Sequence, residues 1–309
     1  MKKIPLAVVA GATASGKTSL AIKLAKEFDG EVVSADSMQI YKYMDIGTAK
    51  PTIDEMEGIP HHLIDIVTPD VNFSVAEYCK RAHAVIDDIT KRGKLPILTG
   101  GTGLYINSVV NDVSFEEAEQ DSALREELLK IAKEQGAEAL HKILEECDPE
   151  SAGKIHANNV KRVIRAIEVF RTTGEKLSEH NEKSKEIISR YSPVMMEILW
   201  DRAELYERIN RRVDIMTEQG LEAEVKKLYE MGYTKDLTSM QGIGYKEMFE
   251  YFDGLWSFDE AIDKIKQYSR NYAKRQNTWF KRDERIVRLN PKEDYVKNAF
   301  ELIRKGVIL

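Results

Sequence analysis

The first third of the chain alternates short apolar runs with longer amphipathic stretches. The apolar runs are Ile4–Ala10, Glu31–Ser34, His62–Val67 and Leu95–Thr99. Hydrophobic residues recur at helical spacing just after residue 18 and again over Val75–Lys91. Short apolar runs that alternate with helical stretches are typical of βαβ units. The pattern therefore predicts an α/β fold, with a parallel sheet flanked by helices.

Strand signals stop near residue 112 and return near residue 193. Helical periodicity between these points covers Ser122–Gln135, Ala137–Glu146 and Asn158–Thr173. The later part predicts a strand at Met195–Trp200, helices over Ala203–Met231 and Phe258–Phe280, a last apolar run at Arg285–Leu289, and a terminal helix. We therefore expect a core formed by residues 1–111 and 193–309, interrupted by an all-helical insertion domain at 112–192.

Composition narrows the class of protein. A chain of 309 residues with 42% hydrophobic and 32% charged residues fits an ordinary folded protein. The first apolar run is too short to span a membrane. Cys79 and Cys147 show no Cys-x-x-Cys spacing, which argues against a disulfide framework or a zinc module. We expect a cytoplasmic monomer with no membrane association.

Charge is distributed unevenly along the chain despite a net charge of −6. Residues 114–150 contain 12 acidic and 4 basic residues, whereas Lys264–Arg288 contains 9 basic and 2 acidic residues. Such a basic stripe suits a nucleic-acid phosphate backbone, and it equally suits the solvated face of a helix.

A phosphate-binding motif separates the first predicted strand from the first predicted helix. Residues 11–18 match G-x-x-x-x-G-K-[ST]. Its glycines let successive N–H groups point at phosphate oxygens, and the helix that follows adds the positive end of its dipole. Lys17 adds a full charge, and Thr18 can ligate Mg²⁺. The predicted diphosphate site consists of Gly11, Ala12, Thr13, Ala14, Ser15, Gly16, Lys17 and Thr18.

The motif alone leaves an NTPase or a small-molecule kinase open. P-loop NTPases commonly end a later strand with an aspartate that organises Mg²⁺ and water, but Leu95–Thr99 runs directly into Gly100–Gly103. Asp36, which closes the second predicted strand, is the nearest predicted carboxylate. Because ligands gather at the carboxyl ends of parallel strands, we favour an active-site role for Asp36 over a helix cap.

Sequence blocks spread over nearly the whole chain resemble the tRNA dimethylallyltransferases. The blocks are Gly11–Thr18, Ser34–Tyr41, Asp45–Lys50, His61–Asp65, Gly100–Tyr105, Asn159–Ala166, Gln241–Glu247 and Lys274–Lys281. Ala12 stands where the family more often has proline, but the glycines and Lys17 of the loop remain. Without a C-terminal zinc module, the chain resembles the bacterial form. The resemblance implies a P-loop NTPase-like sheet that consumes no nucleotide.

The implied reaction transfers a dimethylallyl group from its diphosphate to N6 of adenosine 37, in the anticodon loop of tRNAs that read codons beginning with U. Lys17, the loop N–H groups and Mg²⁺ would stabilise the leaving pyrophosphate. The N6 amine is a poor nucleophile, so we assign Asp36 as its base. Thr102 resembles a substrate-contacting threonine of the family, although a turn residue is the alternative. Arg208 and Arg212 share one helix face, and family analogy favours Arg212 for the diphosphate.

The acceptor adenine must leave its stack, which requires contacts to the surrounding loop. Basic residues on a helix opening near Asn158, and the mixed basic and aromatic segment 274–281, suit phosphate binding and base stacking. Trp279 taken alone would fit core packing better. The expected tRNA contacts are Asp36, Ser37, Met38, Gln39, Thr102, Arg125, Lys161, Arg162, Arg165, Gln241, Lys274, Arg275, Gln276, Trp279 and Lys281.

Three other functions remain open at this point. A P-loop kinase would need ATP and a mobile lid, for which the helical insertion is a candidate. A prenyltransferase acting on free AMP or ADP would not need the basic segments. An RNA-binding module without activity would leave the phosphate loop and Asp36 without a role. His61 and His62 receive no catalytic role, since adjacent strand residues point to opposite faces.

Overall fold

The computed structural model describes residues 3–113, 122–179 and 188–306. The chain divides into two compact units. The first combines Met1–Val110 with Ser189–Leu309, and the second is Asn111–Ile188. These limits lie close to the boundaries expected at residues 112 and 193. Residues 114–121 of the expected acidic segment lie outside the described residues.

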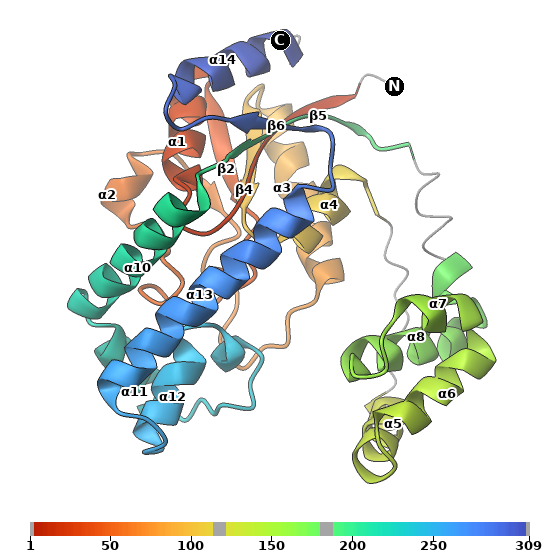
Figure 1. Ribbon diagram of the computed structural model, residues 1–309. Coiled ribbons are helices and arrows are strands. Elements are labelled where there is room, and N and C mark those ends of the chain that lie inside the picture. The colour runs from red at the N-terminus through yellow and green to blue at the C-terminus, as the bar shows by residue number, and fades with distance from the viewer. Residues whose placement is uncertain (1–2, 114–121, 180–187, 307–309) are drawn as a thin grey trace. The chain divides into compact units, whose positions relative to one another are not determined.

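A six-stranded parallel sheet forms the centre of the first unit (Figure 1). Its strands are β1 (Ile4–Ala10), β2 (Gly30–Ser34), β3 (His61–His62), β4 (Leu95–Gly100), β5 (Tyr191–Ile198) and β6 (Ile286–Leu289). Their order is β3-β2-β4-β1-β5-β6, and every neighbouring pair is parallel. The α/β fold predicted from the sequence is confirmed.

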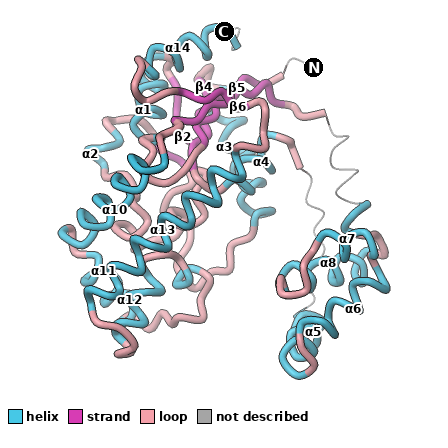
Figure 2. The backbone as a smooth tube through the Cα atoms, viewed as in Figure 1, coloured by secondary structure: helices cyan, strands magenta, loops and turns pink. Residues whose placement is uncertain are grey.

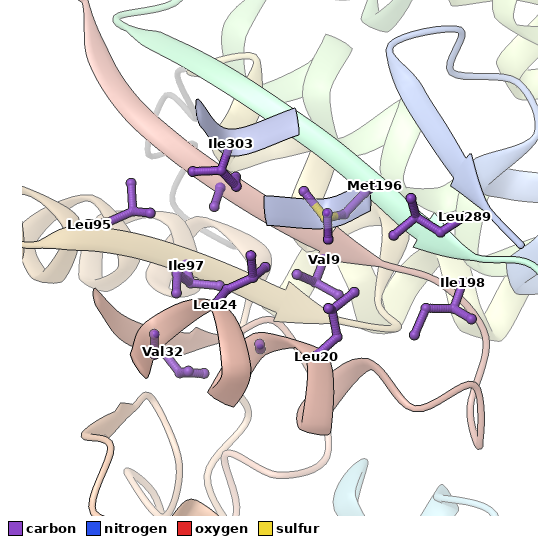
Figure 3. Packing of buried hydrophobic residues seen from close by; sticks show 14 residues of the cluster. Val9, Leu20, Leu24, Val32, Leu95, Ile97, Met196, Ile198, Leu289 and Ile303 are labelled. Atoms are coloured by element: carbon purple, nitrogen blue, oxygen red, sulfur yellow. The ribbon is translucent and has the colours of Figure 1, made fainter. Parts of the chain in front are cut away.

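Helices cover both faces of this sheet. On one face, α1 (Lys17–Glu27) and α14 (Tyr295–Gly306) complete an apolar cluster, in which Leu20 and Leu24 lie near Val9 and Ile97 (Figure 3). The other face packs against α3 (Val75–Lys91) and α4 (Gly103–Val110). Because both faces are covered, β1 is buried over nearly its whole length rather than alternating between buried and exposed residues.

A helical layer adjoins the carboxyl end of the sheet within the same unit. It contains α2 (Ile53–Met56), α10 (Arg202–Glu218), α11 (Leu221–Glu230), the 3₁₀ turn η1 (Ser239–Gln241), α12 (Tyr245–Phe252) and α13 (Phe258–Phe280). Helix α13 packs against α10 and α12 (Figure 1). Apolar residues of α10 to α13 form a second core with Ile40, Tyr41 and Met44, which follow β2.

The secondary structure of the second unit consists of helices joined by loops over its described residues (Figure 2). It contains α5 (Ser122–Glu134), α6 (Ala137–Cys147), α7 (Pro149–Lys154) and α8 (Val160–Thr173). Leu128, Leu140, Leu144, Val163 and Ile167 are fully buried in a core of its own. The unit can therefore hold its shape without apolar packing from the sheet.

Two expected elements differ from the structure. The strand expected over His62–Val67 ends at His62, because Leu63 and Asp65 adopt positive φ angles of 63° and 56°. The single helix expected over Ala203–Met231 is two helices, α10 and α11, which Gly220 separates at a φ of 97°. Helices α4, α7 and α12 were not predicted, since each is short.

Within the described part of the chain, no helix is both long enough and apolar enough to cross a membrane.

Candidate active site

The phosphate loop, defined here as Gly11–Thr18, links β1 to α1. Its backbone takes positive φ angles at Gly11, Ala14 and Gly16, of 134°, 60° and 97°. Gly16 caps α1 without any side-chain hydrogen bond, so the first N–H groups of the helix are left for an anion. The motif found in the sequence therefore has the strand, loop and helix context that phosphate binding requires.

Three basic side chains converge on this loop. Lys17 donates from Nζ to the carbonyl oxygen of Ala12 at 2.7 Å. Arg212 donates to Thr13 Oγ1 at 3.2 Å, and Arg208 Nε donates to the carbonyl oxygen of Ala14 at 2.8 Å. The helical spacing noted in the sequence thus brings both arginines to the loop.

Lys17 and Arg212 are partly buried and lie close together, whereas Arg208 is exposed. Burial, followed by the nearby Arg212 charge, lowers the pKa of Lys17 to about 8, and the Asp36 carboxylate opposes this shift. Burial also lowers the pKa of Arg212. A bound diphosphate would relieve the repulsion between these two cations, so the arrangement favours a multiply charged anion.

Asp36 lies just past the end of β2, where its carboxylate organises a turn. The N–H groups of Met38 and Gln39 donate to Asp36 Oδ1 at 2.9 and 3.3 Å. This is the local geometry of an Asx turn. The Asp36 charge acts on Lys17 and Arg212, which places the carboxylate close to the phosphate loop. We call residues 36–39 the Asp36 turn.

The end of β4 braces the Asp36 turn. Thr102 accepts a hydrogen bond from the Ser37 N–H at 3.0 Å and donates to Ser37 Oγ at 3.2 Å. The two strand ends approach so closely that a Cβ at Gly100 would lie 2.1 Å from the Ala35 carbonyl oxygen. Thr102 therefore positions the Asp36 turn, a contact that sequence analysis did not anticipate.

A second brace joins the phosphate loop to the same region. Gln276 of α13 accepts from the Thr13 N–H and donates to the Gly101 carbonyl oxygen, both at 2.9 Å. Its side chain is buried inside the protein. Burial, followed by the Asp36 charge, raises the pKa of Tyr272 to about 12, so its hydroxyl stays protonated beside Thr102 and Gln276.

These groups open on one cavity of about 350 Å³, a size suited to a small ligand. The cavity extends from the phosphate loop past the Asp36 turn to α10, α13 and the segment 241–245. The expected site residues that line it are Thr13, Lys17, Thr18, Asp36, Ser37, Met38, Gln39, Arg212, Gln241, Arg275 and Gln276.

The side-chain amides of the partly buried Gln39 and the exposed Gln241 both form hydrogen bonds within the protein. Gln39 donates from Nε2 to the carbonyl oxygens of Thr48 and Ala49 at 3.3 and 3.2 Å, and its Oε1 accepts from Ser34. Gln241 donates to the carbonyl oxygen of Lys235. A base edge would have to compete with these bonds, so both amides act first on the shape of the cavity wall.

The last turns of α13 carry the basic and aromatic residues expected to bind tRNA. Lys274, Arg275 and Trp279 line a second hollow of about 420 Å³. Trp279 is 38% exposed, and its ring lies so close to Gly103 that a Cβ there would meet Cδ1 at 2.3 Å. Trp279 is therefore only partly packed, and Lys281 follows as the C-terminal cap of α13.

The second unit holds the remaining expected tRNA contacts. Arg125 Nε lies 2.9 Å from Glu168 Oε1, a carboxylate whose side chain is 4% exposed, and Arg165 lies 3.9 Å from its other oxygen. Lys161 and Arg162 are exposed in the first turn of α8. Helix α8 thus presents two exposed positive side chains, and the buried Glu168 carboxylate holds Arg165 of α8 and Arg125 of α5 in place.

Several residues of the site carried no recognisable sequence signal. Trp200 donates from Nε1 to the Ser15 carbonyl oxygen at 2.9 Å, and the guanidinium of Arg208 lies 4.2 Å from the centre of its ring. Tyr272 lies one helical turn before Arg275 and Gln276, and this spacing is the sequence feature that could have indicated its place in the site. Glu224 and Tyr245 contact the cavity wall from α11 and α12.

Neither histidine of the His61–His62 pair contacts the phosphate loop. His62 Nε2 lies 2.8 Å from Glu31 Oε2, and His61 Nδ1 lies 2.8 Å from the Ile59 carbonyl oxygen. Because a carbonyl oxygen can only accept, His61 carries its proton on Nδ1.

Comparison with known proteins places this site in a family context. Residues 39–283 match the family model described as IPP transferase. The chain is 58% identical to tRNA dimethylallyltransferase of Bacillus cytotoxicus, over 89% of this chain and 86% of that protein. It is 54% identical to tRNA dimethylallyltransferase of Acetivibrio thermocellus, over 93% of this chain and 91% of that protein.

Two solved transferase structures are also similar to this chain. The tRNA isopentenylpyrophosphate transferase from Bacillus halodurans is similar with a TM-score of 0.73 and 45% identity, covering 98% of this chain and 95% of that chain. A eukaryotic dimethylallyltransferase described as acting on tRNA is similar with a TM-score of 0.82 and 31% identity, covering 96% of this chain and 77% of that chain.

Proposed function

Because this chain belongs to the IPP transferase family, we propose that it transfers the dimethylallyl group from dimethylallyl diphosphate to N6 of adenosine 37 in tRNAs that read codons beginning with U. It is a tRNA dimethylallyltransferase, and pyrophosphate is the second product. The observation that carries this proposal is one cavity onto which both the phosphate loop and the Asp36 turn open.

The diphosphate end of the donor binds at the phosphate loop. N–H groups from the loop and the first turn of α1 hold its oxygens, together with Lys17 and Arg212. As the allylic C–O bond breaks, negative charge grows on the leaving pyrophosphate, and these fixed donors stabilise it. Each donor of this kind contributes about 3 kcal/mol to the transition state.

Asp36 accepts the proton that the N6 amine loses as the new N–C bond forms. Both backbone N–H groups of its turn bind Oδ1, which leaves Oδ2 for the substrate proton. One carbon–oxygen bond breaks, one carbon–nitrogen bond forms, and one proton moves to the carboxylate. The atoms and charges therefore balance without a nucleotide or a redox partner.

Mg²⁺ is the metal that the loop fits. Thr18 lines the cavity directly after Lys17 and offers a hard hydroxyl oxygen. No group of three His, Cys, Asp or Glu side chains suited to a metal occurs among the described residues. One protein ligand is compatible with Mg²⁺, which prefers phosphate and water oxygens for its other positions. When bound, the ion would neutralise charge on the leaving pyrophosphate.

The tRNA contacts fall into two groups. One lies on the last turns of α13 and includes Lys274, Arg275 and Trp279. The other lies on the helical unit and includes Arg125, Lys161, Arg162 and Arg165. These positive groups favour a nucleic acid over free AMP or ADP as the acceptor, because a mononucleotide offers too few phosphates to occupy them. We further propose that the protein acts as a cytoplasmic monomer.

The proposed function is tested by incubating the protein with labelled dimethylallyl diphosphate and unmodified tRNA. Parallel reactions contain AMP in place of tRNA, or labelled ATP in place of the prenyl donor. We expect label in tRNA and release of pyrophosphate. Phosphate transfer from ATP would instead identify a kinase, and label in AMP would identify a nucleotide prenyltransferase.

A further inference from the structure

A carboxylate from α11 occupies a ring of backbone N–H groups beside the cavity. Glu224 Oε2 accepts from the N–H groups of Asp45 and Ile46 at 2.9 and 2.7 Å, and its Oε1 accepts from Gly47 at 3.0 Å. Successive N–H groups of this kind form a concave anion site. Glu224 lies in the first turn of α11, where the helix dipole also favours negative charge.

Tyr245 closes this arrangement from the other side. Its hydroxyl donates to Glu224 Oε1 at 2.7 Å. Burial, followed by the Glu224 charge, raises the pKa of Tyr245 well above its ordinary value, so the hydroxyl remains a donor. A Cβ at Gly47 would lie 2.6 Å from the ring of Tyr245, which makes glycine the residue that fits there. We call Glu224, Tyr245 and residues 45–47 the clasp.

The residues just after the clasp form part of the cavity wall. Thr48 and Ala49 line the cavity together with Gly47. Their carbonyl oxygens accept from Gln39 Nε2, at 3.3 and 3.2 Å. Gln39 in turn donates its backbone N–H to Asp36 Oδ1. A continuous series of hydrogen bonds therefore runs from Glu224, through segment 45–49 and Gln39, to the Asp36 carboxylate.

From this geometry we infer that Glu224 is a positioning residue for the general base Asp36. By binding the N–H groups of residues 45–47, it fixes segment 45–49, and this segment holds Gln39 and hence the Asp36 turn. The inference rests on the proposed dimethylallyl transfer. The phosphate loop is braced separately, by Gln276 and Arg212, so donor binding does not depend on the clasp.

The test is the substitution Glu224→Gln, assayed with dimethylallyl diphosphate and unmodified tRNA. A glutamine side chain would direct its NH₂ group at the backbone N–H donors of residues 45–47. Segment 45–49 would then be held less tightly. We expect kcat to fall by on the order of 10-fold, since small misplacements of a reacting group have effects of this size. The KM for dimethylallyl diphosphate should stay within about twofold of the wild type, since the loop is intact.

Glu222→Gln is the matched control. It removes the same charge from the same turn of α11, but Glu222 contacts Tyr251 and not segment 45–47. We expect wild-type kinetics from it. Tyr245→Phe keeps the ring against Gly47 and removes one bond to Glu224, so we expect a smaller fall in kcat with the same unchanged KM.

A double-mutant cycle separates positioning from general damage to the fold. In a Gln39→Ala background, Glu224→Gln should cause little additional loss, because both changes break the same series of bonds. Wild-type kcat in Glu224→Gln, or a full additional loss in the Gln39→Ala background, would overturn the inference. Failure of the wild-type protein to prenylate tRNA would instead overturn the proposed function and leave the clasp without a reaction to support.

Discussion

Asp36 is held by the chain that follows it. Its Oδ1 accepts two backbone N–H groups, and Thr102 braces Ser37 from the neighbouring strand end. A base fixed in this way loses little freedom when the substrate arrives, which is the condition for efficient proton transfer. The same carboxylate lies close enough to influence the pKa values of Lys17 and Arg212.

Asp36→Asn is expected to bind both substrates and to lose most of its turnover. An amide cannot accept the N6 proton, so the single-turnover rate should fall by about 10² to 10⁴. Rapid-quench measurement of labelled tRNA reports this rate directly. Asp54→Asn, an exposed position on α2, serves as the control and should behave as the wild type. Near-normal single turnover by Asp36→Asn would remove this residue from the mechanism.

Lys17 predicts a pH dependence of donor binding. Its pKa is lowered to about 8 from the ordinary value of 10.5, so the charge is lost as the pH rises through 8 in the free protein. A bound diphosphate favours the charged form, so binding takes up a proton above this pH. Affinity for dimethylallyl diphosphate should then weaken by up to about 10-fold per pH unit above 8.

Calorimetry between about pH 7 and 9.5 measures how the affinity for dimethylallyl diphosphate changes with pH. The phosphates are almost fully ionised over this range, so their own protonation contributes little to the change. Lys17→Arg is the control, since its side chain stays charged throughout. Its affinity should not follow the same pH dependence. Equal slopes for the two proteins would show that another group takes up the proton.

Helix α13 contributes both to the cavity and to an exposed basic surface. Gln276 and Tyr272 fix the phosphate loop and the segment that follows β4. Arg275 and Trp279 lie within one helical turn of these residues on the same side of the helix, and they continue it outward to a hollow that Lys274 also lines. Since one rigid helix carries both sets, the spacing between the reaction cavity and this outer surface is fixed by helix geometry.

Replacing Lys274 and Arg275 by alanine should weaken tRNA binding and flatten its salt dependence. Loss of two single-strand phosphate contacts reduces the slope of log K against log salt by about 1.4. Filter binding at several salt concentrations provides the slope. Lys226→Ala with Lys227→Ala, an exposed pair on α11, is the matched control. An unchanged slope in the α13 variant would argue against phosphate contacts at this helix.

At the scale of the whole molecule, donor binding and part of the proposed tRNA binding belong to different units of the chain. The phosphate loop and the cavity belong to the first unit, whereas Lys161 and Arg162 belong to the second, which has its own core. A change confined to α8 should therefore alter tRNA affinity without altering donor affinity.

Charge reversal at Lys161 and Arg162 tests this separation. We expect the Kd for tRNA to rise by about 10-fold or more, because each reversed side chain repels a phosphate instead of attracting it. The Kd for dimethylallyl diphosphate should not change. Reversal of the exposed Lys133 and Lys142 in the same unit is the control. Equal effects of the two pairs would mean that net charge, rather than a specific contact at α8, governs the affinity.

The sequence by itself determined the parallel α/β core, the phosphate loop and the family. These are local features: apolar runs, helical periodicity, and a motif whose glycines, lysine and threonine act within eight consecutive residues. It also placed Asp36 at a strand end and the basic residues on helices. It missed the break at Gly220 and the end of β3, where single backbone angles decide the outcome.

Tertiary structure alone decided which distant side chains meet. Gln276 binds Thr13 across 263 positions of sequence, and Glu224 binds Gly47 across 177. No periodicity or spacing encodes such pairs, because they depend on how α11 packs against α10 and α12, and α13 against α4, α10 and α12. Gln276 and Gln39, which we expect to contact tRNA, also brace the cavity, since an amide out of water must satisfy its donors and acceptors with the groups that the fold brings within reach.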